Sequence, residues 1–224
     1  MSIWIIVLLV MVLSFIVQQV LQSKFEKYGK IRTYGGLTGA QIAEKMLRDN
    51  GIYDVQVTSV PGTLTDHYNP QTKTVNLSAA VYSTNSIAAA AVAAHECGHA
   101  VQDAEGYIPL RFRNTLVPVA NLGSRFSWLL IIAGLLFSAL SLMKLGIFAF
   151  CAVVLFQLIT LPVEFNASNR AMAALEGGGF MEHEELRQTG KVLKAAALTY
   201  VAAALTSILQ LARLLLIFNR GNRR

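Results

Sequence analysis

Charged residues are scarce in this chain of 224 residues: they make up 14% of the sequence, whereas hydrophobic residues make up 54%. Soluble globular domains carry roughly a quarter charged residues. This shortage of charge argues against an ordinary soluble domain and favours a membrane protein in contact with the lipid bilayer. The net charge of +6 comes from Lys and Arg at the ends of apolar runs. That placement suits anionic lipid headgroups and does not indicate a nucleic-acid partner.

Cysteine is also scarce, because the chain contains only Cys97 and Cys151. Two cysteines cannot form a disulfide framework, and they give no sign of an oxidising compartment. Internal repeats and linkers rich in Ser, Pro or Gly are absent as well. The sequence therefore predicts a single domain over residues 1–224, in which membrane segments alternate with the other parts of the chain.

Long apolar runs, in contrast, are present and predict about four transmembrane or membrane-associated helices. They cover approximately residues 3–20, 126–143, 145–163 and 195–218. A single helix over residues 126–163 would be roughly 55 Å long, against a hydrocarbon core of ~30 Å, so two spans with a tight hairpin near Lys144 are predicted. The first run is predicted to be a retained anchor, because no basic residue precedes it and no small-residue cleavage site follows it.

The parts between the spans are predicted to form a small mixed region. Thr38 and Gln41 form a capping-box signature before a short amphipathic stretch that ends at Gly51. Residues 53–60 alternate as a strand does, and residues 62–78 read as two extended pieces around an Asn-Pro turn. Residues 86–104 are rich in alanine and predict a helix.

A His-Glu-x-x-His motif, formed by His95, Glu96 and His99, lies on this alanine-rich stretch. Two histidines four residues apart on a helix share one face, so both imidazoles reach one Zn²⁺. Glu96 then faces the open coordination position, where it takes a proton from a zinc-bound water and passes it to the leaving amine. The motif predicts hydrolysis of protein or peptide substrates with one Zn²⁺ per chain.

A catalytic zinc needs a third protein ligand, and the sequence offers two routes to it. In the long metzincin pattern a glycine three residues after the second histidine turns the chain, but this chain has Gln102 there, so the helix is expected to carry Glu105 away. The other route uses Glu164 from a second helix. Two membrane crossings between His99 and Glu164 return the chain to the side on which the motif helix ends, and an acidic residue at the edge of a span needs a partner.

Three segments resemble a known family. The runs LTDHYNP, AAHECGHA and LPVEFNASNRA are similar to the YugP-like putative neutral zinc metallopeptidases of bacteria, over nearly the whole chain. The order of motif helix, two spans and Glu-Phe-x-Ala is more distantly similar to the HtpX and Ste24 membrane proteases. This resemblance implies a gluzincin-type site with Glu164 as the third ligand. Those proteases carry an aspartate where this chain has Ser168, which leaves the orientation of a zinc-bound histidine to Ser168, Asn166 or Asn169.

The expected fold is therefore a mainly α membrane protein with a zincin-like α+β catalytic part, formed by residues 23–125 and 164–194. Basic residues beside a span tend to remain cytoplasmic, and Lys24, Lys27, Lys30 and Arg32 follow the first run. The sequence predicts a multi-pass protein of the bacterial cell membrane with a cytoplasmic catalytic part.

Other polar residues are weaker candidates for the site. His67 and Tyr68 precede the motif in the β element, where they could steady an oxyanion or simply be solvated turn residues. Arg170 could pair with a substrate carboxylate or an acidic neighbour, although a surface or lipid-headgroup role is simpler. His183 lies among three glutamates, and a solvated first turn of the last helix explains it better than a second metal.

Three other functions remain as alternatives. An intramembrane site-2-type protease would take an aspartate ligand from a later helix, and no aspartate follows Asp103. A non-catalytic metal-binding scaffold or chaperone has no need of Glu96 as a base, and a closed structural site usually has four ligands. A small transporter would need polar groups in mid-span, where only Gln157 and Arg213 stand out.

Overall fold

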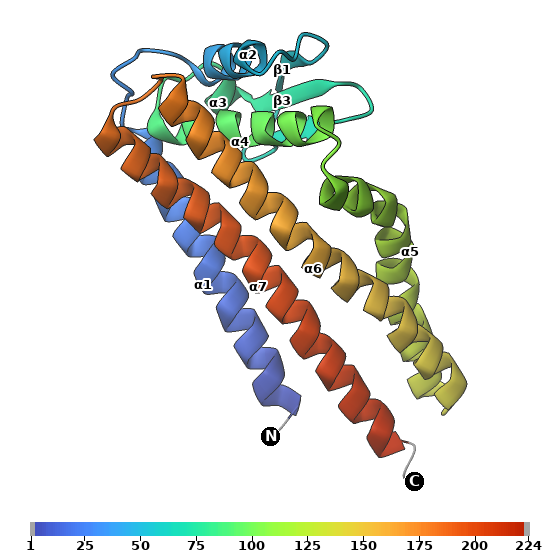
Figure 1. The fold of residues 1–224 in the computed structure, drawn as a ribbon. Helices are drawn as coiled ribbons and strands as arrows, with labels where there is room; N and C mark the ends of the chain where they lie inside the picture. Colours follow the sequence, from blue (N-terminus) through green and yellow to red (C-terminus); the bar gives the residue numbers. More distant parts are fainter. Residues whose placement is uncertain (1–2, 222–224) are drawn as a thin grey trace. The chain divides into compact units, whose positions relative to one another are not determined.

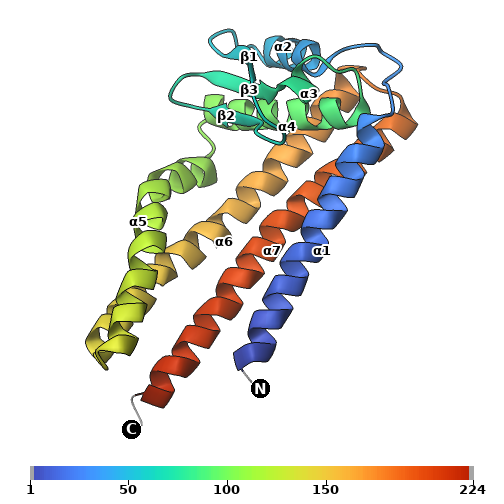
Figure 2. The same ribbon diagram turned by 180° about the vertical axis from the view of Figure 1, so that it is seen from behind.

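The computed structural model describes residues 3–221, so the arginines at positions 223 and 224 lie outside the described residues. Helices dominate, and a short three-stranded sheet lies between the second and third helices along the chain (Figures 1 and 2). In chain order the elements are α1 (Ile3–Gly29), α2 (Gly39–Asp49), β1 (Gln56–Val60), β2 (His67–Asn69), β3 (Thr74–Ser78), α3 (Ala79–Tyr82), α4 (Ile87–Ala104), α5 (Ile108–Leu136), α6 (Leu140–Gly177) and α7 (His183–Gly221).

Within residues 3–221, four helices are long and apolar enough to cross a membrane. They are Ile5–Gly29, Ile108–Leu136, Leu140–Gly177 and His183–Asn219. The predicted fold, a mainly α membrane protein with a small β element, is thereby confirmed. Each helix extends past the apolar run that predicted it at one end or both, although α5 stops short of the end of its run, at Leu136. Because α6 extends to Gly177, Glu164 lies inside it and not at its end.

The turn between α5 and α6 lies at residues 137–139, so the prediction of a hairpin near Lys144 is wrong. Ser138 adopts a positive φ of 52°, which reverses the chain there. Gly134 explains why the turn comes early: a Cβ on this glycine would lie 2.7 Å from the backbone nitrogen of Met143. The two helices therefore meet in backbone contact directly after the turn, and Lys144 becomes part of α6.

The chain divides into two compact units. The first consists of residues up to 17, residues 111–162 and residues from 199 onward, and it contains the apolar parts of the long helices. The second consists of residues 18–110 and 163–198. The predicted catalytic parts largely coincide with this second unit, except that residues 111–125 begin α5 and cluster with the apolar helices.

The second unit is built around the sheet, whose strand order is β1-β3-β2. The central strand β3 pairs in parallel with β1 and antiparallel with β2, so β2 is an edge strand. Val75 and Leu77 of β3 are fully buried and belong to a core shared with α2, α4 and α6. The predicted capping box is present at the start of α2, where Thr38 Oγ1 accepts from Gln41 N at 3.3 Å.

Candidate metal centre

Helix α4 carries the His-Glu-x-x-His motif through the core of the second unit. Ser86 begins the helix as an N-cap, since its Oγ accepts from Ala89 N at 3.1 Å. The alanines of α4 from Ala88 to Ala100 are almost fully buried, and their small side chains allow neighbouring elements to approach on nearly every side. His95 and His99 lie one turn apart on the same face, with their ring centroids 4.9 Å apart.

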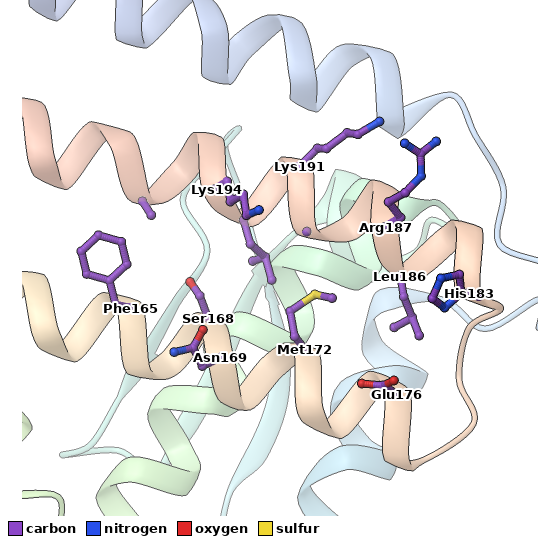
Figure 3. A pocket seen from close by; sticks show the side chains of 13 residues that line it. Phe165, Ser168, Asn169, Met172, Glu176, His183, Leu186, Arg187, Lys191 and Lys194 are labelled. Atoms are coloured by element: carbon purple, nitrogen blue, oxygen red, sulfur yellow. The ribbon is translucent and has the colours of Figure 1, made fainter.

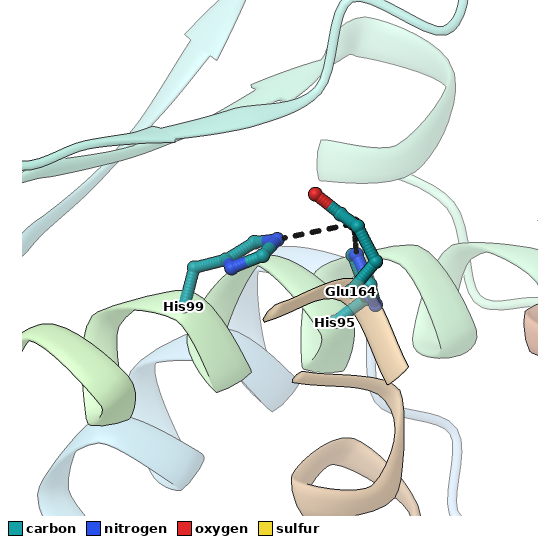
Figure 4. A group of neighbouring side chains, drawn as sticks. All are labelled: His95, His99 and Glu164. Carbon is teal, nitrogen blue, oxygen red and sulfur yellow. Dashed lines mark hydrogen bonds and ion pairs between the residues drawn. The ribbon is translucent and has the colours of Figure 1, made fainter. Parts of the chain in front are cut away.

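Glu164 reaches these two rings from α6. Its Oε2 lies 3.2 Å from His95 Nε2 and 3.5 Å from His99 Nε2 (Figure 4). The side chain of Glu164 is 2% exposed, so its carboxylate is removed from water. Among residues 3–221, His95, His99 and Glu164 are the one group of three or more His, Cys, Asp or Glu side chains close enough to hold a metal.

These three side chains fit a zinc ion. Ligands about 2.0 Å from a tetrahedral zinc stand roughly 3.3 Å from one another. The two separations from Glu164 Oε2, 3.2 Å and 3.5 Å, lie on either side of that value, and the three ligand atoms all lie within 4.8 Å of one another. A buried carboxylate is costly without a compensating charge, and a divalent cation would supply it. Two imidazoles and one carboxylate are a protein donor set typical of catalytic zinc sites, in which water or substrate takes the fourth position.

The outer nitrogens of both imidazoles have polar partners. Ser168 Oγ lies 3.2 Å from His95 Nδ1, and Gln102 Oε1 lies 3.0 Å from His99 Nδ1. Both histidines thus turn Nε2 toward Glu164 and Nδ1 toward a polar side chain. Such partners orient the histidines of metal sites. The sequence left this role open between Ser168, Asn166 and Asn169, and it did not suggest Gln102.

Glu96 lies beside the three candidate ligands and is also buried. The backbone N–H of Tyr68 in β2 donates to Glu96 Oε2 at 2.9 Å. Burial raises the pKa of the Glu96 carboxyl, while the nearby His95 and the Tyr68 N–H lower it. A raised pKa suits a group that both accepts and releases a proton near neutral pH.

The other candidates lie close to the motif but bond elsewhere. The hydroxyl of Tyr68 donates to Asp103 Oδ2 at 2.8 Å, and the exposed ring of His67 places Nδ1 2.8 Å from the carbonyl oxygen of Thr65. Arg170 pairs with an acidic neighbour, Glu105, at 2.6 Å. Helix α4 continues through Gln102, as expected from the lack of a glycine there. Glu105 follows the end of the helix and is absent from the ligand group.

Nearly the whole chain matches a known family. Residues 3–219 match the family model described as "Putative neutral zinc metallopeptidase". The chain belongs to this family. A relative from Bacillus subtilis (strain 168), "Putative membrane protease YugP", is 50% identical over 209 residues, which cover 93% of this chain and 93% of the relative. No solved structure matches the chain significantly. The resemblance inferred from the sequence segments is therefore confirmed.

This member of the zinc metallopeptidase family has a cavity of about 600 Å³ between α6 and α7, in its second unit. Figure 3 shows Leu186 pointing between the two helices, while the charged ends of Arg187 and Lys191 point away from α6. Ser168 lines the cavity and also contacts His95. The cavity therefore extends to Ser168, which contacts His95 at Nδ1, the ring nitrogen that does not face Glu164.

Sequence reasoning missed Gln102 as a partner of the centre. The residue was considered only as the position where a metzincin would have glycine. A signal did exist, since Gln102 lies three residues after His99 and therefore on the same face of α4. The helical period alone does not show what an amide there would contact, because its other partners come from α6.

Proposed function

We propose that this chain is a membrane-bound, zinc-dependent endopeptidase in which His95, His99 and Glu164 hold one Zn²⁺ and Glu96 is the general base. The observation that carries the proposal is the convergence of the three buried ligand atoms within 4.8 Å of one another. Membership of a zinc metallopeptidase family and the apolar helices support the same function. The substrate is a protein or peptide.

The chemistry is divided between the metal and the side chains of this chain. When bound, Zn²⁺ acts as a Lewis acid that polarises the attacking water and the substrate carbonyl. Glu96 takes a proton from that water and delivers it to the leaving amine. The Tyr68 N–H holds the Glu96 carboxylate on the side of β2, which fixes the direction from which the proton is taken.

The edge strand β2 supports a peptide substrate. In the antiparallel register Tyr68 lies opposite Val75 of β3, and its backbone N–H donates to Glu96 of α4. The outer edge of β2 therefore lies beside the proposed general base. An extended peptide can add to such an edge through its backbone, which would bring its carbonyl groups past the centre.

The site does not favour an intramembrane protease. Helix α4 is not among the four candidate spans, and its motif lies in the second unit, outside the apolar segments that form the first unit. A glutamate, not an aspartate, approaches the histidines. We therefore place hydrolysis outside the hydrocarbon core.

Metal content and proteolysis of the purified full-length protein test the proposal. We expect about one Zn²⁺ per chain, lost in His95→Ala, His99→Ala and Glu164→Ala, because each variant removes one of only three protein ligands. Glu96→Gln should keep the metal and lose hydrolysis by at least roughly 100-fold, since the amide keeps the shape but removes the base.

His183→Ala is the matched control, because His183 is exposed at the start of α7 and lies outside the ligand group. It should retain zinc. Wild-type zinc content in both motif-histidine variants would contradict the metal assignment. Wild-type hydrolysis by Glu96→Gln would leave a metal site whose base lies elsewhere, and an inactive wild type with bound zinc would favour the scaffold alternative.

A further inference from the structure

Gln102 is the most deeply buried polar side chain next to the proposed metal ligands, with an exposed fraction of 0%. We infer that Gln102 is a positioning residue that acts through His99: its amide oxygen fixes the imidazole while its amide nitrogen fixes α6 on both sides of Glu164. This inference rests on the proposed function, because it assigns a role toward zinc bound by His99 and Glu164.

The contacts of the Gln102 amide connect the two ligand-bearing helices. Its Oε1 lies 3.0 Å from His99 Nδ1, one turn earlier on α4. Its Nε2 donates to the carbonyl oxygen of Val163 at 2.9 Å and to Asn166 Oδ1 at 2.9 Å. Val163 precedes Glu164 and Asn166 follows two residues after it. One side chain therefore contacts a metal-binding histidine and the backbone that presents the third ligand.

The partners decide which way the amide points. Two acceptors, the Val163 carbonyl and Asn166 Oδ1, face one end of the side chain, so the donating nitrogen must lie there. Asn166 Oδ1 also accepts from Arg170 Nε at 2.7 Å, which confirms it as an acceptor. The Gln102 oxygen is then left for His99, and it can only accept. His99 Nδ1 must carry the proton, so its Nε2 presents a lone pair on the side of Glu164.

Only an amide can accept from His99 Nδ1 and also donate to the two acceptors on α6. A glutamate at position 102 would accept from His99 but would face two acceptors on α6 without a proton to donate. A methionine would keep the length of the side chain and lose every hydrogen bond. Ser168 does not fix His95 in the same way, because a hydroxyl can donate or accept. The orientation of His99 therefore depends on Gln102 more strictly than that of His95 depends on Ser168.

Two substitutions distinguish the contact of Gln102 with His99 from its contacts with α6. For Gln102→Met we expect zinc affinity, measured by chelator competition on the full-length protein in nanodiscs, to fall roughly 10- to 100-fold. For Gln102→Glu we expect most of that affinity to return, because the carboxylate again accepts from His99. The apparent unfolding temperature of the metal-free protein should fall in both variants, since both lose the two hydrogen bonds to α6.

Glu105→Gln is the matched control, at the residue that caps the C-terminal end of the same helix. It removes the charge from Glu105 and so weakens the ion pair with Arg170 of α6, without touching a proposed ligand. Its zinc affinity should equal that of the wild type. A purely structural role of Gln102 predicts instead that zinc affinity is unchanged in all three variants, or falls equally in Gln102→Met and Gln102→Glu. Either result would overturn the inference.

A measurement on the wild type keeps the test independent of whether the variants fold. Nitrogen-15 NMR of histidine-labelled, zinc-loaded protein should show His99 bound to zinc through Nε2 with a proton on Nδ1. Zinc on His99 Nδ1 would overturn the inference while leaving the proposed function intact. Failure of the proposed function would give a different result: the wild type itself would bind no zinc, or His99→Ala would bind zinc normally.

Discussion

At the scale of single residues, the centre combines buried groups that each need a partner. Glu164 is a buried carboxylate whose neighbours are two imidazoles. Glu96 is a buried carboxyl that accepts from a backbone N–H. Because burying charge without compensation is costly, these groups make a cation at their meeting point energetically favourable. Cys97, between Glu96 and Gly98, takes no part, since burial raises the pKa of its thiol and its Sγ contacts the Ala43 carbonyl of α2.

At this scale we predict that the hydroxyl of Ser168 contributes to zinc affinity through its contact with His95. This hydroxyl is a weaker partner for a histidine than a carboxylate would be. Ser168→Ala removes the contact of 3.2 Å with His95 Nδ1, so we expect zinc affinity to fall by about 10-fold. Chelator competition with purified protein measures this change.

Asn169→Ala serves as the control, because Asn169 lines the same cavity one residue later and is exposed. The sequence left open whether Ser168, Asn166 or Asn169 orients the histidine. A loss of affinity in Asn169→Ala with none in Ser168→Ala would transfer the role to Asn169. Asn166 acts differently from both, since its Oδ1 receives Gln102 and Arg170.

At the scale of elements, the centre depends on the close approach of α4 and α6. Gly98 lies between Cys97 and His99, and a Cβ there would lie 2.5 Å from the backbone oxygen of Ala167. Ala167 is separated from Glu164 by less than one helical turn and precedes Ser168. The distance between the motif helix and the third-ligand helix is thus set by the absence of a single side chain.

Gly98→Ala tests this contact. The added methyl group meets backbone, which cannot rotate away, so the helices must separate at a cost of about 1–3 kcal/mol. We expect a lower apparent unfolding temperature and weaker zinc binding, because Glu164 moves together with Ala167. Thermal unfolding in detergent and chelator competition measure the two effects.

Gly190→Ala is the matched control in the interior of α7, where the new Cβ would meet only the flexible end of Met172 at 3.8 Å. Since alanine favours a helix over glycine by about 1 kcal/mol, this variant should be as stable as the wild type or more so. A Gly98→Ala protein with wild-type stability and zinc affinity would show that the two helices tolerate a wider spacing.

At the scale of the whole molecule, membrane association follows from four long apolar helices and from similarity to a membrane protease. The side of the membrane is a prediction. Basic residues cluster after the first apolar run and again before the second, whereas Lys144 alone lies between the second and third runs. Because basic loops tend to remain cytoplasmic, residues 23–125 and 164–194 should face the cytoplasm.

Cysteine labelling of intact cells tests this topology. Single cysteines replace Lys30 or Lys144 in a background in which both native cysteines, Cys97 and Cys151, are changed to alanine. An impermeant reagent should label position 144 and not position 30. Labelling of position 30 but not position 144 would reverse the arrangement.

The sequence by itself determined the local features of this protein. The four apolar runs predicted the long helices, the Thr38–Gln41 box and Ser86 predicted two helix starts, and the motif spacing predicted a shared face for His95 and His99. These features depend on neighbours within a few residues, and helical period and hydropathy report such neighbours directly. The position of the α5–α6 turn was missed, because it depends on how Gly134 packs against Met143.

Only the tertiary structure decided how distant residues meet at the centre. It placed Glu164 3.2 Å from His95, which lies 69 residues earlier, and it joined Gln102 to the Val163 carbonyl 61 residues later. It also directed the Tyr68 hydroxyl to Asp103 and Arg170 to Glu105. These partners are fixed by the packing of α4 against α6 and β2 in one buried core. A local pattern of residues carries no information on that packing, because it depends on the shapes and volumes of side chains that are far apart in the chain.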